Sequence, residues 1–150
     1  MKISSIHDLE KISNKIKKKL TPGDFVFLYG EIGVGKTTFA RLLINNYENE
    51  KNLKASEVLS PTFNIVFEYD IKKFKIKHYD LYRLKNDNDI KNIGLFEDSE
   101  QSITVIEWPE LIKKKPLNRI DLFFKYSENM SERFLNIKTS GRLKDHEFSK

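Results

Sequence analysis

The octapeptide from Gly30 to Thr37 places glycines, a lysine and a threonine in the pattern G-x-x-x-x-G-K-T. Glycines lack a Cβ, so the backbone can adopt positive φ there and pass close to an anion. Successive backbone N–H groups then point into one concavity that can hold phosphate oxygens. In this Walker A pattern, Lys36 is expected to reach the β- and γ-phosphates and Thr37 to bind Mg²⁺ through its hydroxyl. The alternative is a plain glycine turn between a strand and a helix.

A Walker A loop also needs an acidic residue near the metal. The hydrophobic run from Ile103 to Ile106 predicts a strand, and it ends directly at Glu107. Because Mg²⁺ keeps several water ligands, few protein ligands are enough. We therefore predict that Glu107 assists Mg²⁺, in a position where most such proteins have Asp. The alternative is a strand-end carboxylate that only faces solvent.

Two further residues could act near a γ-phosphate. Asp80 follows another predicted strand and could orient the attacking water or complete the surroundings of the metal, since a carboxylate repels phosphate oxygens. Its alternative role is an ion pair with Arg83. Thr62, in the segment Ser60-Pro61-Thr62, could belong to a switch loop that orders when its hydroxyl senses the γ-phosphate and Mg²⁺. Its alternative is an ordinary turn before a strand.

Three more side chains are left open by local sequence. His78 could be a general base, although a single His flanked by aromatic residues is more often packed and hydrogen-bonded. Trp108 follows Glu107 and is either buried or stacked at the edge of a site. Arg133 lies in a predicted strand and reaches a nucleotide or only caps the surface.

The elements that position these residues follow from the spacing of apolar side chains. Residues 25–29 form a continuous apolar run that predicts a buried parallel strand leading into the loop. After Thr37, Phe39, Leu42, Leu43 and Tyr47 recur at helical spacing, which predicts a helix to about residue 47. Strand, loop and helix therefore stand in the order that a phosphate loop requires.

The rest of the chain adds elements around this unit. Ser5 and Asp8 have capping-box spacing, which predicts a helix that ends near the turn at residues 21–23. Two β-rich runs, at residues 64–69 and 74–82, predict an antiparallel hairpin beside the loop strand. The remaining predicted elements are a short helix at residues 90–97 and two strands at residues 120–126 and 133–138.

Length and composition bound the kind of protein. The length of 150 residues predicts one domain, which we assign to residues 1–140, followed by a polar C-terminal tail at residues 141–150. The absence of Cys excludes disulfides and thiolate metal sites. No segment approaches the ~18 apolar residues of a membrane span, and residues 1–20 lack the apolar core of a signal peptide. We expect a cytoplasmic protein that makes no contact with a membrane.

The net charge of +5 leaves two other functions to weigh. A basic domain can attract nucleic acid, so a non-catalytic RNA-binding module is one alternative; solvated lysine-rich surfaces account for the same charge. A small-molecule kinase with the same phosphate loop is the other alternative. Such kinases usually carry a lid rich in arginines, and this chain has no arginine-rich segment.

Four blocks of the sequence together resemble the TsaE (YjeE) family, small bacterial ATPases required for making threonylcarbamoyladenosine beside the anticodon of tRNA. The resemblance extends over roughly residues 5 to 138. The blocks are Gly30–Phe39, Ser60–Phe63, His78–Leu84 with the pattern H-x-D-L-Y-R-L, and Ile106–Glu110 with the sequence I-E-W-P-E.

This resemblance implies a fold, a site and partners. The implied fold is α/β, a single P-loop NTPase domain with a mixed, mainly parallel sheet flanked by helices and an antiparallel hairpin. By the same resemblance Thr37 and Glu107 bind Mg²⁺, Thr62 is the switch threonine and Asp80 is needed for turnover. The residues expected to contact ATP are Glu31, Ile32, Gly33, Val34, Gly35, Lys36, Thr37, Thr38, Trp108 and Arg133.

The implied partners are the proteins TsaD and TsaB, and contact with tRNA is expected to be indirect, through their complex. In the family, the ATPase is thought to reset that complex between cycles and not to modify tRNA itself. A residue before the first helix touches adenine in the family, which here falls within Ser4 to Asp8.

Overall fold

The computed structural model describes residues 1–144 and residue 148. Its elements, in chain order, are β1 (Lys2–Ile3), α1 (Ile6–Lys17), β2 (Phe25–Tyr29), α2 (Lys36–Glu50), β3 (Val66–Asp70), β4 (Lys75–Asp80), α3 (Asp87–Asn92), η1 (Ser99–Gln101), β5 (Ser102–Glu107), η2 (Pro109–Leu111), β6 (Arg119–Tyr126), β7 (Arg133–Ser140) and η3 (Gly141–Leu143). In this part of the chain no helix is both long and apolar enough to cross a membrane.

The strands form one seven-stranded sheet in the order β1-β7-β6-β2-β5-β4-β3. The central strands β6, β2, β5 and β4 are parallel to one another. At the two flanks, β7 pairs antiparallel with β6 and β1, and β3 pairs antiparallel with β4. The predicted α/β fold, a mixed, mainly parallel sheet flanked by helices and an antiparallel hairpin, is therefore confirmed.

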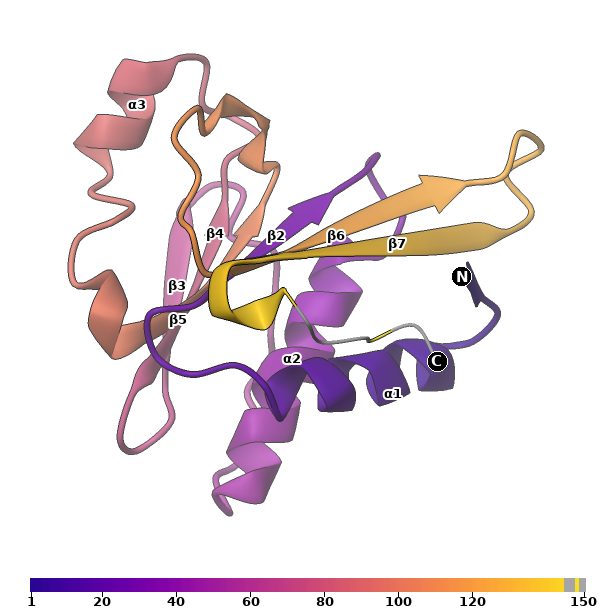
Figure 1. The fold of residues 1–150 in the computed structure, drawn as a ribbon, viewed down its shortest axis with the longest axis horizontal. Helices are drawn as coiled ribbons and strands as arrows, with labels where there is room; N and C mark the ends of the chain where they lie inside the picture. The colour runs from indigo at the N-terminus through magenta and orange to yellow at the C-terminus, as the bar shows by residue number, and fades with distance from the viewer. Residues whose placement is uncertain (145–147, 149–150) are drawn as a thin grey trace.

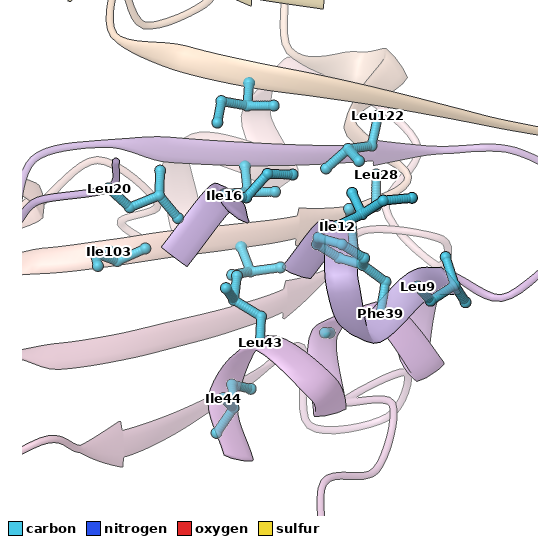
Figure 2. Packing of buried hydrophobic residues seen from close by; sticks show 14 of the residues in the cluster. Leu9, Ile12, Ile16, Leu20, Leu28, Phe39, Leu43, Ile44, Ile103 and Leu122 are labelled. Carbon is cyan, nitrogen blue, oxygen red and sulfur yellow. The ribbon is translucent and has the colours of Figure 1, made fainter. Parts of the chain in front are cut away.

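Helices α1 and α2 lie side by side and cover one face of this sheet (Figure 1). The predicted capping box begins α1, because the Ser5 hydroxyl accepts a hydrogen bond from the backbone N–H of Asp8 and the Asp8 carboxylate accepts one from that of Ser5. Apolar side chains at helical spacing then face the sheet. Those that Figure 2 labels in this layer are Leu9, Ile12 and Ile16 of α1, Phe39, Leu43 and Ile44 of α2, and Leu20, Leu28, Ile103 and Leu122 from the sheet and its connections.

The opposite face of the sheet carries a smaller apolar layer. Phe25 and Phe27 of β2 pack there with residues from α3 and from the segments that flank it. Because β2 and β5 contribute buried side chains to both faces, their sequences read as continuous apolar runs and not as alternating ones. The two layers hold the carboxyl ends of the parallel strands in a fixed arrangement.

The structure corrects two predictions, one about the position of the hairpin and one about the bounds of a helix. The β3–β4 hairpin does not lie beside β2, because β5 is inserted between β2 and β4. All six residues of β5 are buried, which suits a central strand, whereas β3 exposes side chains and forms the edge. The short helix predicted at residues 90–97 is α3, Asp87–Asn92, because the Asn86 side chain caps it earlier by accepting a hydrogen bond from the backbone of Asp89.

The end of one helix also differs from expectation. Helix α2 continues past residue 47 to Glu50, because the buried Glu48 carboxylate accepts hydrogen bonds from the Asn45 side chain and the Ser56 backbone and holds the last turn. The predicted tail partly lies outside the described residues, which omit 145–147 and 149–150. Its first residues form η3, with Leu143 buried in the main core. The domain limit at residue 140 stays a prediction.

Candidate functional site

The register of the central strands brings the predicted site residues to one edge of the sheet. Glu107, the last residue of β5, lies opposite Leu28 of β2 on one side and opposite Asp80 of β4 on the other. The carboxyl ends of parallel strands meet at the same edge of a sheet, which is where open α/β folds bind ligands. The glycine-rich loop starts at this edge, directly after β2.

The loop fits tightly against the neighbouring strand β6. Gly30 has a φ of 136°, and a Cβ at this position would lie 2.6 Å from the backbone oxygen of Phe124. Gly35 has a φ of 121° and leads directly into α2, which begins at Lys36. The positive end of the α2 dipole therefore faces the loop, as in sites that bind phosphate.

Lys36 lies across the loop and contacts the loop's own backbone. Its Nζ donates hydrogen bonds to the carbonyl oxygens of Gly30 at 2.5 Å and Glu31 at 2.8 Å, and it lies 4.0 Å from the centre of the Trp108 ring. Burial lowers the pKa of Lys36, while nearby carboxylates, Glu107 first among them, act in the opposite direction. The ammonium group is thus held where a phosphate bound in the loop would meet it.

Thr37 and Glu107 form the pair of oxygen donors expected for Mg²⁺. The Thr37 hydroxyl donates to the Glu107 carboxylate, with distances of 2.9 Å to Oε1 and 3.1 Å to Oε2. Two ligands on adjacent corners of an octahedron with metal–oxygen bonds of 2.0–2.1 Å lie about 2.9 Å apart, so the pair fits this cation. Over residues 1–144 and 148, no three acidic, His or Cys side chains gather into a metal cluster, so an ion here would also need water or phosphate oxygens.

Asp80 is the centre of a separate hydrogen-bond cluster. Its Oδ2 accepts from the Ser60 hydroxyl at 2.6 Å and from the Thr62 hydroxyl at 2.9 Å, and its Oδ1 accepts from the backbone N–H of Tyr82 at 2.9 Å. The carboxylate is buried, and Arg83, its predicted alternative partner, lies with its guanidinium 5.1 Å from the centre of the Phe63 ring. The segment predicted as a switch loop is thus tied to the end of β4.

His78 is buried on β4, two residues before Asp80, and faces Glu107. Its Nε2 lies 2.9 Å from Glu107 Oε1, and both side chains are almost fully enclosed. Its other ring nitrogen, Nδ1, has no hydrogen-bond partner among the described residues. His78 is therefore a packed, hydrogen-bonded residue, as its aromatic neighbours suggested, and not a base exposed to a substrate.

A cavity of about 370 Å³ lies between the loop, Asp80 and Glu107. It contains most of the predicted site residues. Its lining residues are Ile32, Gly33, Gly35, Lys36, Thr37, Thr38, Ser60, Thr62, Asp80, Tyr82, Glu107 and Trp108. Trp108 adopts a left-handed backbone conformation, with a φ of 57°, and its ring lies at the rim, 4.9 Å from the centre of the Tyr82 ring.

Three predicted contact residues lie outside this lining. Glu31 contributes its backbone carbonyl to Lys36, and Val34 is buried in the main core. Arg133 begins β7, with its guanidinium 5.7 Å from the centre of the Tyr126 ring. It also lies opposite Ile3 of β1, next to the Ser4–Asp8 segment. The roles of these residues in binding a nucleotide stay predictions.

Two lining residues were not among the predicted site residues. Ser60 shares Asp80 with Thr62, and Tyr82 packs against Trp108. Ser60 stands two residues before Thr62 in the segment predicted as a switch loop, so its position near Thr62 could have indicated it. Tyr82 stands two residues after Asp80, but strand β4 ends at Asp80, and only the observed turn shows which way Tyr82 points.

Comparison with known proteins gives the same family that the motifs suggested. Residues 3–135 match the family described as Threonylcarbamoyl adenosine biosynthesis protein TsaE. The matched region contains the loop, Asp80, Glu107 and the whole parallel part of the sheet.

Curated relatives carry the name tRNA threonylcarbamoyladenosine biosynthesis protein TsaE. The protein from Rickettsia typhi is 33% identical over 146 residues, which cover 95% of this chain and 96% of the relative. The protein from Aquifex aeolicus is 34% identical over 118 residues, which cover 79% and 80%. The protein from Rickettsia felis is 36% identical over 111 residues, which cover 74% of this chain. The chain spans only 63% of the length of that relative.

A solved structure has the same fold. The crystal structure of YdiB from Bacillus subtilis superposes with a TM-score of 0.71, covering 94% of this chain and 84% of that chain at 24% sequence identity. This likeness supports the α/β architecture.

Proposed function

The chain belongs to the TsaE family, whose members serve tRNA threonylcarbamoyladenosine biosynthesis, and from this premise we propose that it binds and hydrolyses ATP with Mg²⁺ in the cavity between the glycine-rich loop and Glu107. One observation carries the proposal. Lys36 and Thr37 at the start of α2 and Glu107 at the end of β5, 70 residues after Thr37, converge on one cavity at the carboxyl edge of the sheet. That edge is where a triphosphate binds in α/β proteins with such a loop.

Phosphate binding is supported by the loop and by α2. The backbone N–H groups after Gly33 and the start of α2 offer donors and a positive dipole end to an anion. Lys36 would exchange the carbonyl oxygens of Gly30 and Glu31 for phosphate oxygens, which are stronger acceptors because they are charged. Trp108, which now lies against the Lys36 ammonium, would lose that contact in the same exchange.

Hydrolysis is supported by the positions of the polar side chains around the cavity. Thr37 and Glu107 would hold Mg²⁺, which when bound neutralises charge on the phosphates. Asp80 points into the cavity from β4 and would orient the attacking water, once Thr62 leaves it for the nucleotide.

We further propose that the ATPase acts on a complex of TsaD and TsaB, with tRNA contacted only through that complex. The family role supports a place in this pathway. The lining residues Ile32 and Tyr82, and Phe63 next to Thr62 in sequence, expose large apolar side chains. An exposed apolar rim suits a site that a protein partner covers.

The test uses the chain with and without TsaB and TsaD. Phosphate release from ATP is measured for the natural protein, for Lys36→Ala and Glu107→Ala, and for Lys11→Ala as a control on the exposed face of α1. We expect Lys36→Ala to lose most ATP binding and Glu107→Ala to lose turnover while keeping part of the binding. The control should match the natural protein.

A second measurement links the ATPase to tRNA. In a bacterium lacking its own TsaE, the natural chain should restore threonylcarbamoyladenosine in tRNA, and Lys36→Ala should not. Equal phosphate release by the natural protein and Glu107→Ala would contradict the metal site. Transfer of phosphate from ATP to a metabolite in place of phosphate release would favour a small-molecule kinase.

A further inference from the structure

We propose that His78 is a positioning residue that holds the Glu107 carboxylate in one orientation for the Mg²⁺ that accompanies ATP. The inference rests on the proposed function, because it gives His78 a part in the same site. It assigns a role to a fully buried side chain that neither the phosphate loop nor the Asp80 cluster uses.

The contact between the two side chains is short and enclosed. His78 Nε2 lies 2.9 Å from Glu107 Oε1, and the side-chain exposures are 0% and 3%. An ionised carboxylate, the form that binds a cation, can only accept a hydrogen bond, so with Glu107 in that form His78 donates from Nε2. Since Nδ1 has no partner among the described residues, Glu107 is the single polar group that orients the ring in that part of the chain.

The strand register brings His78 to this place. In the parallel pair of β4 and β5, His78 lies opposite Val105, and Asp80 lies opposite Glu107. Residues two apart on a strand share a face, so His78 and Asp80 both face the side on which Glu107 meets α2. His78 therefore reaches Glu107 diagonally from a buried strand, and its position depends on the sheet and not on a loop.

Glu107 needs such a partner because its side chain has more freedom than the Asp that commonly occupies this position. Glutamate has one more rotatable bond than aspartate, and a terminal carboxylate torsion is broad. The Thr37 hydroxyl lies at nearly equal distances from both carboxylate oxygens, 2.9 and 3.1 Å, so it does not select one orientation. His78 contacts Oε1 alone, which fixes the carboxylate and leaves Oε2 facing the Thr37 hydroxyl.

The competing explanation is that His78 only fills the core. In that case its replacement lowers stability and affects every property of the site together. A positioning role predicts a selective effect on metal binding, because partners that orient metal ligands change metal affinity about 10- to 100-fold when removed. The two explanations also differ for glutamine, whose side-chain amide can donate a hydrogen bond from a place close to that of Nε2.

The experiment compares the natural chain with His78→Gln, His78→Leu and Ile76→Ala. Ile76 is a matched control, since it is fully buried on the same face of β4 and carries no polar side-chain atom. For each protein, ATP affinity is measured with EDTA and with excess Mg²⁺, using the fluorescence of the single tryptophan, Trp108. Mg²⁺ is then titrated into the ATP complex, and thermal unfolding is recorded in parallel.

We expect His78→Leu to weaken the apparent Mg²⁺ affinity of the ATP complex about 10- to 100-fold and to leave ATP affinity in EDTA unchanged. His78→Gln should recover most of this loss, and Ile76→Ala should lower only the unfolding temperature. An unchanged Mg²⁺ affinity in His78→Leu, or an equal loss in His78→Gln, would overturn the positioning role. If the natural chain binds ATP no more tightly with Mg²⁺ than with EDTA, the proposed function itself fails, and the role of His78 fails with it.

Discussion

At the scale of single residues, the candidate site is held in place by hydrogen bonds among its own members. Lys36 donates to the carbonyls of the loop, Thr37 donates to Glu107, and Thr62 donates to Asp80. Each of these donors or acceptors is one that a nucleotide or its metal would use. Binding therefore exchanges internal contacts for contacts with the ligand, and the affinity depends on the difference between the two sets.

The Asp80 cluster can be tested by replacing the carboxylate. Because three donors converge on Asp80, Asp80→Asn places an N–H group where an acceptor is needed and leaves at least one buried donor without a partner. We expect the free energy of unfolding to fall by about 1–3 kcal/mol, measured by urea denaturation. Asp70→Asn, at an exposed position at the end of β3, is the control, and an equally small effect of both substitutions would contradict the cluster's role.

At the scale of elements, the path of the loop is set by how β2 and β6 pack together. Gly30 and Gly35 both have positive φ, but their surroundings differ. A Cβ at Gly30 would meet the Phe124 backbone at 2.6 Å, whereas a Cβ at Gly35 would have no heavy atom within 4 Å. The first glycine is needed for space and conformation, and the second for conformation alone.

This difference predicts unequal costs for two alanine substitutions. Gly35→Ala should lower the free energy of unfolding by about 1–3 kcal/mol, from backbone strain alone. Gly30→Ala should cost about 1–3 kcal/mol more, because the loop or β6 must also move. Urea denaturation of the two variants measures both values, and equal costs would show that the loop can move away from Phe124 without penalty.

The packing of α1 against α2 has its own pH dependence. Tyr47 of α2 is buried and donates a hydrogen bond to the carbonyl oxygen of Lys17 at 3.0 Å. Burial, with a smaller contribution from Glu50, raises the pKa of Tyr47 far above its ordinary value near 10. The unfolded chain therefore ionises this tyrosine first, and its contribution to stability is present below pH 10 and is lost as the pH rises above that value.

Tyr47→Phe should therefore behave differently at two pH values. Near neutral pH it should be less stable than the natural protein by about 1 kcal/mol, because the hydrogen bond is lost. At pH 11, one unit above the pKa of the unfolded tyrosine, the natural protein should lose about 1.4 kcal/mol relative to Tyr47→Phe, so the order reverses and Tyr47→Phe becomes slightly the more stable protein. Urea denaturation at both pH values measures the change, and a constant difference would contradict the raised pKa.

At the scale of the whole molecule, the end of the chain is joined to the turn before β2. Arg142 of η3 donates a hydrogen bond at 3.1 Å to one carboxylate oxygen of Asp24, forms a shorter ion pair with the other, and also donates to Thr21 and to the Lys19 carbonyl. Asp24 is 1% exposed, so its charge is neutralised mainly by this contact. The segment after β7 therefore stabilises the strand that leads into the loop.

Removal of this contact should destabilise the entire domain. Arg142→Ala leaves the buried Asp24 carboxylate without its cation, and we expect a loss of about 1–3 kcal/mol in the free energy of unfolding, since Thr21 still donates to Asp24. Lys144→Ala, an exposed neighbour, is the control. If Arg142→Ala is as stable as Lys144→Ala, the contact between Arg142 and Asp24 does not stabilise the domain.

The local units of the protein follow from the amino-acid sequence alone. The order of strand, glycine-rich loop and helix, the capping box of α1, and Glu107 at the end of an apolar strand could all be predicted. They depend on residues close together in the chain, where hydrophobic spacing and the conformational freedom of glycine act directly. The family could be predicted for the same reason, since its motifs are short and contiguous.

Which of these units touch depends on the complete fold. Strand β5 is inserted between β2 and β4. Thr62 donates a hydrogen bond to Asp80, and His78 contacts Glu107, so these contacts join residues 18 or more positions apart. Strand order and register set these contacts, and a shift of one residue would turn each side chain to the opposite face of the sheet. Order and register depend on the burial of all strands together, so no local spacing specifies them.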